Sequence, residues 1–127
     1  MPKILIVDDE PHIRILLEQT MEDLEDQGVD LLLAEDGEEA LGVIRVERPE
    51  LVLLDVMMPR MNGFEVCHTV KKELGLEEVY IVLLTAKGQE FDKQKGIEAG
   101  ADVYVTKPFN PDEIMAKARE VLRLPAE

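Results

Sequence analysis

The stretch Leu51-Val52-Leu53-Leu54-Asp55 decides how this chain folds. Four apolar residues in a row are typical of a strand buried on both faces of a parallel sheet, and they are too few for a free-standing helix. The run ends on a carboxylate. Because ligands of open parallel sheets bind beyond the carboxyl ends of the strands, Asp55 is a candidate for chemistry. Capping of the next helix is the other interpretation of Asp55, but that helix begins near Asn62, too far along the chain.

Outward from this strand, strand patterns and helical patterns alternate along the chain. Short apolar or β-branched runs predict four further strands, over residues 3–7, 29–34, 79–84 and 101–105. Helical spacing and helix breakers predict five helices, over residues 11–24, 37–46, 63–74, 89–99 and 112–122. Five strands alternating with five helices predict an α/β fold, in which right-handed crossovers build a parallel sheet covered on both faces.

Length and charge limit the classes of function. The 127 residues predict one domain, residues 1–127, with a proper core. A net charge of −14 argues against direct nucleic-acid binding, which needs a basic surface, and it suits a metal cation. The single cysteine, Cys67, excludes a disulfide framework. Since no apolar run is long enough for a signal peptide or a membrane span, we expect a cytoplasmic protein without membrane contact.

The ends of the other predicted strands also carry polar side chains. Asp8 and Asp9 follow the first strand, Thr85 follows the fourth, and Lys107 follows the fifth. In a parallel sheet all of them lie at the same edge as Asp55. Three crowded carboxylates need a cation or a shared proton, and oxygen-only ligands select a hard cation such as Mg²⁺. With Mg²⁺, an ammonium and a hydroxyl nearby, the residues predict an aspartate nucleophile that accepts a phosphoryl group.

These residues resemble the receiver domain of two-component response regulators. The resemblance covers nearly the whole chain and is closest in two stretches, LLDVMMPRMNG at 53–63 and GADVYVTKPF at 100–109. It implies a flavodoxin-like doubly wound fold with strand order 2-1-3-4-5. It also implies a phosphorylation-activated switch rather than a turnover enzyme, similar to chemotaxis-type single-domain regulators and to the receivers of winged-helix transcription regulators.

The resemblance assigns roles at the metal. Asp55 is implied to be the phosphoacceptor and to bind Mg²⁺ directly, together with the Asp9 carboxylate and the backbone carbonyl of Met57. Asp8 is implied to act through a metal-bound water. Mn²⁺ is an alternative ion.

The resemblance also assigns roles around the phosphoryl group. Thr85 and Lys107 are implied to bind its oxygens, and Lys107-Pro108 to be a cis peptide bond. Thr85 and Tyr104 are implied to form a switch pair. Phosphorylation is expected to draw the Thr85 hydroxyl toward the phosphoryl group, so that the Tyr104 ring enters the vacated space and the surface of the last strand and last two helices changes.

The implied partners are a sensor histidine kinase or a histidine phosphotransfer protein, and an output domain or protein that the sequence does not identify. On the wheel of helix 11–24, Ile15 lies opposite the core stripe, which makes it a candidate docking residue; a lone exposed apolar side chain is the other interpretation. A phosphorylation-dependent homodimer, as in winged-helix regulators, is suggested by Lys93, Glu98, Asp102, Glu113 and Lys117. Val103 stands where such proteins have a second Asp, so the set is incomplete. The chain is either a stand-alone regulator, a relay intermediate or an excised receiver.

Three other functions fit the residues less well. A flavodoxin-like redox carrier needs a phosphate-cradling loop after the first strand, where this chain has Asp8-Asp9-Glu10-Pro11. An aspartate-nucleophile phosphatase resembles Asp-x-Asp, but Met57 stands two residues after Asp55. A pseudo-receiver that only binds partners would not need the full set of site residues.

Overall fold

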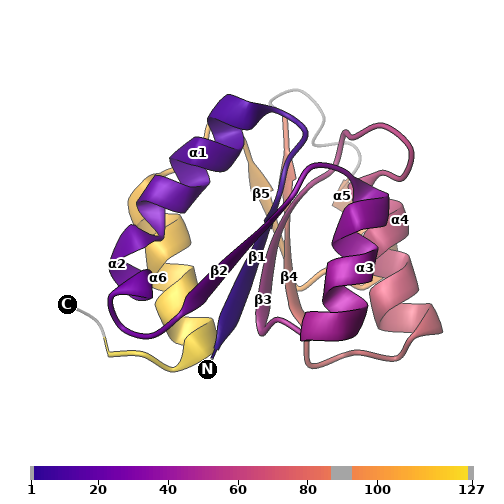
Figure 1. The fold of residues 1–127 in the computed structure, drawn as a ribbon. Coiled ribbons are helices and arrows are strands. Elements are labelled where there is room, and N and C mark those ends of the chain that lie inside the picture. Colours follow the sequence, from indigo (N-terminus) through magenta and orange to yellow (C-terminus); the bar gives the residue numbers. More distant parts are fainter. Residues whose placement is uncertain (1, 87–92, 126–127) are drawn as a thin grey trace.

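A parallel sheet lies between two layers of helices in the computed structural model, which describes residues 2–86 and 93–125 (Figure 1). Its strands are β1 (Lys3–Val7), β2 (Asp30–Ala34), β3 (Leu51–Asp55), β4 (Tyr80–Thr85) and β5 (Val103–Thr106). They lie in the order β2-β1-β3-β4-β5, and all four neighbouring pairs are parallel. The predicted fold class and strand order are confirmed.

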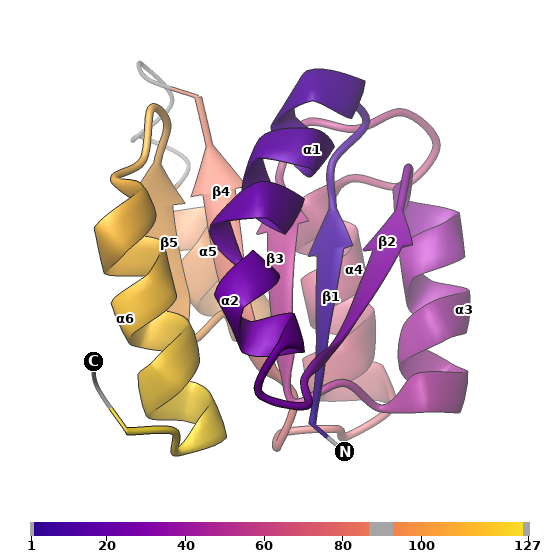
Figure 2. The same ribbon diagram turned by 60° about the vertical axis from the view of Figure 1, so that its left-hand side comes forward.

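The helices divide between the two faces of the sheet (Figures 1 and 2). One face carries α1 (Pro11–Thr20), α2 (Glu22–Glu25) and α6 (Pro111–Leu122). The other carries α3 (Gly37–Glu47), α4 (Gly63–His68), the π-helix η1 (Thr69–Glu73) and α5 (Lys93–Ala99). None of the helices within the described residues is both long and apolar enough to cross a bilayer.

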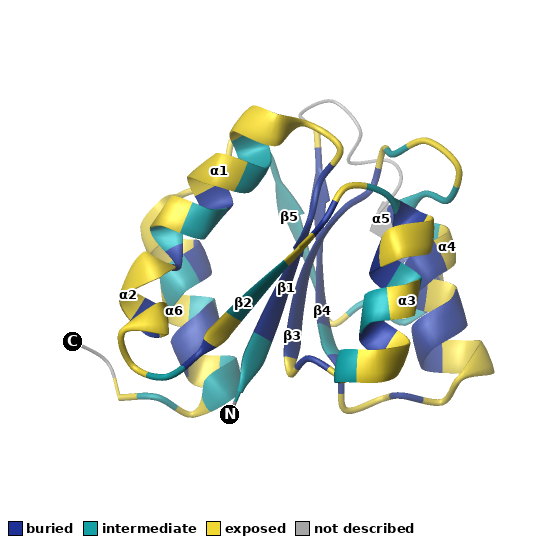
Figure 3. Ribbon diagram, viewed as in Figure 1, coloured by how far each residue is buried: buried dark blue, intermediate teal, exposed yellow. Residues whose placement is uncertain are grey.

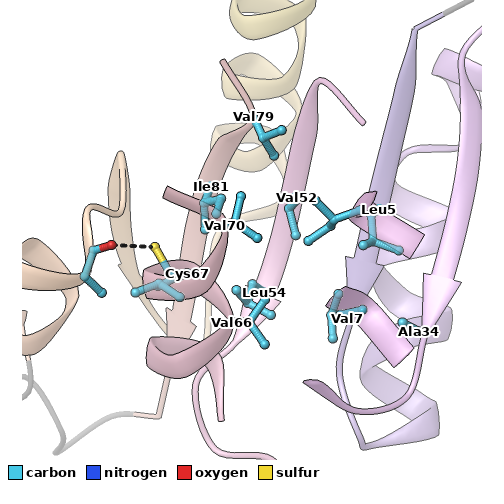
Figure 4. Close-up of a cluster of buried hydrophobic side chains, with 14 of the residues drawn as sticks. Leu5, Val7, Ala34, Val52, Leu54, Val66, Cys67, Val70, Val79 and Ile81 are labelled. Carbon is cyan, nitrogen blue, oxygen red and sulfur yellow. Dashed lines mark hydrogen bonds between the residues drawn. The ribbon is translucent and has the colours of Figure 1, made fainter. Parts of the chain in front are cut away.

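Strand β3 is buried along its whole length, as its uninterrupted apolar run predicts (Figure 3). Its side chains alternate between two core clusters. Val52 and Leu54 join the cluster on the α3 and α4 side, where Val66 and Val70 also lie (Figure 4). Leu51 and Leu53 join the cluster on the α1 and α6 side. Because both layers pack on this strand, its end is fixed at the middle of the sheet.

Two predicted helices are interrupted. The helix predicted for residues 11–24 breaks at Met21, where φ is −90° and ψ is 1°. Met21 and Leu24 both stay fully buried, so the spacing of apolar residues does not reveal the break. The helix predicted for 63–74 widens into η1, in which the Leu74 N–H bonds the Thr69 carbonyl at 2.8 Å. A π-turn leaves no mark in a 3.6-residue period.

The remaining predicted bounds lie within two residues of the observed ones, and several coincide with them. Strands β4 and β5 end at Thr85 and Thr106, each one residue later than predicted, so Thr85 is the last strand residue rather than the first loop residue. The predicted start of a helix at Gln89 lies outside the described residues.

Candidate functional site

The carboxyl ends of the strands point to one edge of the sheet, here called the carboxyl edge (Figure 2). The Lys107 ammonium lies between two carboxylates there, 2.9 Å from Asp8 Oδ2 and 3.0 Å from Asp55 Oδ1. Asp8 is fully buried and Asp55 is 4% exposed. The structure therefore brings together three of the predicted site residues, from the ends of β1, β3 and β5.

The buried charges at this edge do not balance, and the imbalance changes the pKa of the Asp55 carboxyl. Burial raises the pKa of Asp55 to about 7, and the neighbouring Asp8 carboxylate adds to the rise against the attraction of Lys107. Burial alone would lower the pKa of Lys107, but its hydrogen bond to Asp8 and the charge of Asp55 outweigh burial and raise it. One ammonium thus serves two buried carboxylates, which leaves one negative charge in excess.

Asp9 lies at the surface beside Asp8. Carboxylate oxygens of Asp8, Asp9 and Glu10 lie within 4.8 Å of one another. The Asp8 side chain also accepts a hydrogen bond from the Glu10 N–H at 2.9 Å, which orients its second oxygen toward Lys107. This oxygen-only donor set fits a hard cation such as Mg²⁺. Asp8 and Asp9 of this cluster would hold it, Asp55 stays a predicted further ligand, and the cation would supply the positive charge that the edge lacks.

The loop after β3, residues 56–62, turns sharply into α4. Its first residue, Val56, donates to the Leu84 carbonyl and accepts from the Gly63 N–H, each at 2.9 Å. A Cβ at Gly63 would lie 2.4 Å from the Asp55 carbonyl oxygen, so only glycine permits this close approach. Asn62 and Glu65 form a capping box at the start of α4, which confirms that Asp55 does not cap this helix.

The ends of β4 and β5 are joined beside Asp55. Thr85 is fully buried and pairs with Thr106 in the sheet. Its carbonyl accepts a hydrogen bond from the Lys107 N–H at 2.6 Å. Lys107-Pro108 is a cis peptide bond, as the resemblance implied. Thr85 and Lys107 thus come from neighbouring strands at the same level of the edge.

The Tyr104 ring packs inward against α5. Tyr104 is partly buried against the α3 and α4 core cluster, and it pairs with Leu83 across the β4–β5 ladder. A Cβ at Gly96 would lie 3.0 Å from Tyr104 Cδ2 and 3.2 Å from Leu83 Cδ1. The missing side chain at Gly96 therefore makes room for the ring, which is a role that the sequence analysis did not predict.

Arg14 is a second residue that the sequence analysis missed. Its guanidinium donates to the Asp8 carbonyl at 2.6 Å and pairs with Glu35 at 3.2 Å. Arg14 therefore ties α1 to the backbone of the carboxyl edge and to the end of β2. The only sequence signal for this role is its position, in the first turn of the helix that follows the Asp8-Asp9 pair.

The comparisons with known proteins identify this arrangement. Residues 4–119 match the family model described as the response regulator receiver domain. The chain belongs to the response regulator receiver family. Members of this family are signalling switches of two-component systems rather than turnover enzymes.

Individual relatives agree with the receiver assignment. The chain is 47% identical to the alkaline phosphatase synthesis transcriptional regulatory protein PhoP of Bacillus subtilis, over 95% of this chain and 48% of that protein. The chain therefore spans about half the length of the curated relatives that it matches. The receiver domain of DrrB, solved in its BeF3-activated form, superposes with a TM-score of 0.83 at 35% identity, covering 97% of this chain and 98% of that one. The chemotaxis response regulator CheY4 of Vibrio cholerae gives 0.81 at 35%, with coverages of 95% and 98%.

Among the described members of the charged set suggested for a receiver dimer, Glu98, Asp102 and Glu113 are exposed and Lys117 is half-buried. Asp102 accepts from the Lys71 ammonium at 2.9 Å and from the Ile81 N–H at 2.8 Å. Lys117 lies 6.0 Å from the centre of the Tyr80 ring and 3.2 Å from Glu120. The side chain of Lys93 lies outside the described residues. Asp102 makes internal contacts while it is itself exposed, so the suggested dimer surface stays a prediction.

Proposed function

We propose that this receiver accepts a phosphoryl group on the Asp55 carboxylate in the presence of Mg²⁺ and passes the signal through Thr85 and Tyr104. The observation that carries the proposal is the sharing of Lys107 between Asp8 and Asp55 at the carboxyl edge. A buried site with two carboxylates and one ammonium favours a bound dication. The same dication and Lys107 would stabilise the charge that develops on a transferring phosphoryl group.

Each residue has a distinct part in this proposal. An Asp55 oxygen forms the bond to phosphorus while the bond from phosphorus to the donor's leaving group breaks. Asp9 and the Met57 carbonyl bind the metal with Asp55, and Asp8 binds it through water. Lys107 then moves its hydrogen bond from the Asp55 carboxylate to a phosphoryl oxygen.

The readout proposed for the switch depends on the Thr85 hydroxyl. A phosphoryl group adds roughly two negative charges beside this hydroxyl and attracts it. Because Tyr104 packs on Gly96 of α5, a change in the ring position alters the α5–β5–α6 surface that an output domain or partner would read. The phosphoryl donor is a histidine kinase or a phosphotransfer protein. Ile15 is 52% exposed, as the helical wheel predicted, so it is available to contact such a donor.

The experiment is phosphorylation by acetyl phosphate, followed by intact mass. The unaltered protein should gain one phosphoryl group with Mg²⁺ present and none after EDTA is added. Asp55→Asn should gain none under either condition. Asp102→Asn, which alters a carboxylate at the other end of β5, is the matched control and should gain one. Labelling of Asp55→Asn at the rate of the unaltered protein would overturn the proposal.

A further inference from the structure

The loop after β3 contains a residue in an unusual backbone conformation. Arg60 has φ of 68°, in the left-handed region that side chains other than glycine rarely adopt. Strained residues of this kind persist only where their surroundings hold them, and they gather at functional sites. Arg60 lies between Met57 and the start of α4, five residues after the proposed phosphoacceptor.

The start of α3 holds this loop through two neighbouring residues. The Arg60 guanidinium donates to Asp36 Oδ2 at 2.6 Å, and the Asp36 side chain is only 17% exposed. A Cβ at Gly37 would lie 2.0 Å from the Met61 carbonyl oxygen, so the α3 backbone and the loop backbone are in direct contact. The loop therefore rests on α3 as well as on β4.

Asp36 is itself fixed. Its Oδ1 accepts a hydrogen bond from the Glu39 N–H at 2.9 Å, which makes it the N-cap of α3. That hydrogen bond, with help from the charge of Arg60, lowers the pKa of Asp36, so the carboxylate is charged at neutral pH. Asp36 thus bonds the α3 backbone through one oxygen and Arg60 through the other, so the helix holds the loop in place.

We propose that Arg60 is a positioning residue for the cation site: its bond to Asp36 holds residues 57–61 in the conformation that presents the Met57 carbonyl to Mg²⁺. This inference rests on the proposed function, in which Met57 is a metal ligand. Arg60 itself touches neither the metal nor the phosphoryl group. Its contribution is to remove freedom from a loop that would otherwise be ordered only when the ion binds.

The sign of the effect separates positioning from simple electrostatics. Removing a guanidinium takes a positive charge away from the neighbourhood of a dication, so a purely electrostatic role would make Mg²⁺ bind more tightly after Arg60→Ala. A positioning role predicts the opposite. Asp36→Asn keeps a good N-cap while weakening the bond to Arg60, and Arg60→Lys keeps the charge but not the fork of donors.

The chain offers a matched control. Arg48 is also an arginine with positive φ, 49°. It is the C-cap of α3, at the opposite end of that helix from Asp36. Arg48→Ala therefore removes the same side chain from another position of positive φ without touching the loop after β3. Any general effect of losing an arginine from a left-handed position should appear equally in both variants.

The experiment measures Mg²⁺ affinity by titration calorimetry and amide hydrogen exchange of residues 57–61 without metal. We expect Arg60→Ala to weaken Mg²⁺ binding about fivefold, the most that a largely exposed ion pair is expected to give, and to speed exchange in the loop. Asp36→Asn should do the same, with no further loss in the double variant, because both act through one contact. Arg60→Lys should restore part of the affinity, and Arg48→Ala should match the unaltered protein.

Three outcomes would overturn the inference. These are equal or tighter Mg²⁺ binding by Arg60→Ala, an equal loss in Arg48→Ala, or unchanged loop exchange. If the unaltered protein itself binds no Mg²⁺, the proposed function fails and the positioning role falls with it. If the unaltered protein binds Mg²⁺ and Arg60→Ala binds it equally well, only the positioning role fails.

Discussion

Two lysines meet carboxylates at the two ends of β5, and the contrast between them separates structure from function. Before the strand, Lys71 pairs with Asp102 at 2.9 Å and with the Glu77 carbonyl at 2.9 Å. After the strand, Lys107 is shared by Asp8 and Asp55. Both ammonium groups are largely removed from solvent, with side chains 6% and 16% exposed. One pair is balanced, and the other site keeps an excess negative charge.

The balanced end of β5, where Lys71 pairs with Asp102, joins secondary-structure elements. Asp102 bonds the Lys71 ammonium and the Ile81 N–H, and the nearby Cys67 thiol donates to the Ala99 carbonyl at 3.5 Å (Figure 4). These contacts connect η1 and α4 to the end of α5 and to β4. At the carboxyl edge, by contrast, the unbalanced charge is a cost in the absence of a cation. The difference teaches that a buried charge with matched partners indicates architecture, whereas an excess indicates a ligand.

Breaking the balanced end should have the largest effect on stability. Asp102→Asn leaves the buried Lys71 ammonium without its counter-charge, so we expect the free energy of unfolding to fall by about 3 kcal/mol. Urea denaturation measures the change. Replacing Lys71 by Met in the same variant should recover part of the loss, because no charge is then stranded. A fall below about 0.5 kcal/mol would show that the pair is only a surface contact.

The same chemical change at the carboxyl edge should have the opposite sign. Asp55→Asn removes the excess charge, so without metal at about pH 8 we expect the free energy of unfolding to rise by about 2 kcal/mol. Asp9→Asn, at an exposed position, is the control and should change it by less than about 0.5 kcal/mol. Destabilisation by Asp55→Asn would contradict the charge imbalance.

The stability gained by Asp55→Asn should depend on pH, because it follows from the pKa of Asp55. Its pKa is about 7 in the folded protein and 3.8 without the fold, so between these values the folded state binds more protons than the unfolded state. The stability that Asp55 contributes in its protonated form is present below about pH 4 and is lost as the pH rises through about 7. The advantage of Asp55→Asn should therefore be full above pH 7 and vanish near pH 4.

Mg²⁺ should stabilise the protein through the carboxyl edge and not through the Lys71–Asp102 junction before β5. At ten times its dissociation constant, the ion should raise the free energy of unfolding by about 1.4 kcal/mol. The gain should shrink as the pH falls below about 7, because protons then compete for Asp55. Asp9→Ala should lose the gain, whereas Asp102→Asn should keep it. Thermal melts with and without Mg²⁺ would show this, and an undiminished gain in Asp9→Ala would remove Asp9 from the site.

The smallest expected effect is on the Cys67 thiol. Burial raises the pKa of Cys67 to about 12, so a thiol reagent should label it only when the structure opens. Asp102→Asn should lower the free energy of that local opening by about 1 kcal/mol and speed labelling about fivefold, whereas Asp55→Asn should not speed it. Equal labelling of the two variants would mean that the two ends of β5 are not independent.

The sequence predicts the carboxyl edge better than the junction before β5, and the reason is topological. A parallel sheet places every strand end at one edge, so Asp8, Asp55 and Lys107 can be brought together from strand assignments alone. The way in which Lys107 divides its hydrogen bonds depends on side-chain positions that no pattern contains. The pairing of Asp102 with Lys71 was not predicted, although Lys71 is four residues after the buried Cys67 and therefore on the inner face of its helix.

Backbone irregularities explain most of what else was missed. The break at Met21 and the π-turn of η1 leave the apolar faces intact, so the helical period passes through them unchanged. The left-handed Arg60 is also invisible in the sequence, because arginine gives no sign of positive φ as glycine does. These features set the loop geometry around the site, and only the structure shows them.

The most direct test of the account is to locate the phosphoryl group after acetyl phosphate treatment with Mg²⁺. Borohydride reduction converts an aspartyl phosphate into homoserine, and peptide mass spectrometry then identifies the modified residue. The account predicts that the unaltered protein is modified at Asp55 alone and that Asp55→Asn is not modified at all. Modification at Asp8, at Asp9 or elsewhere in the unaltered protein would contradict it.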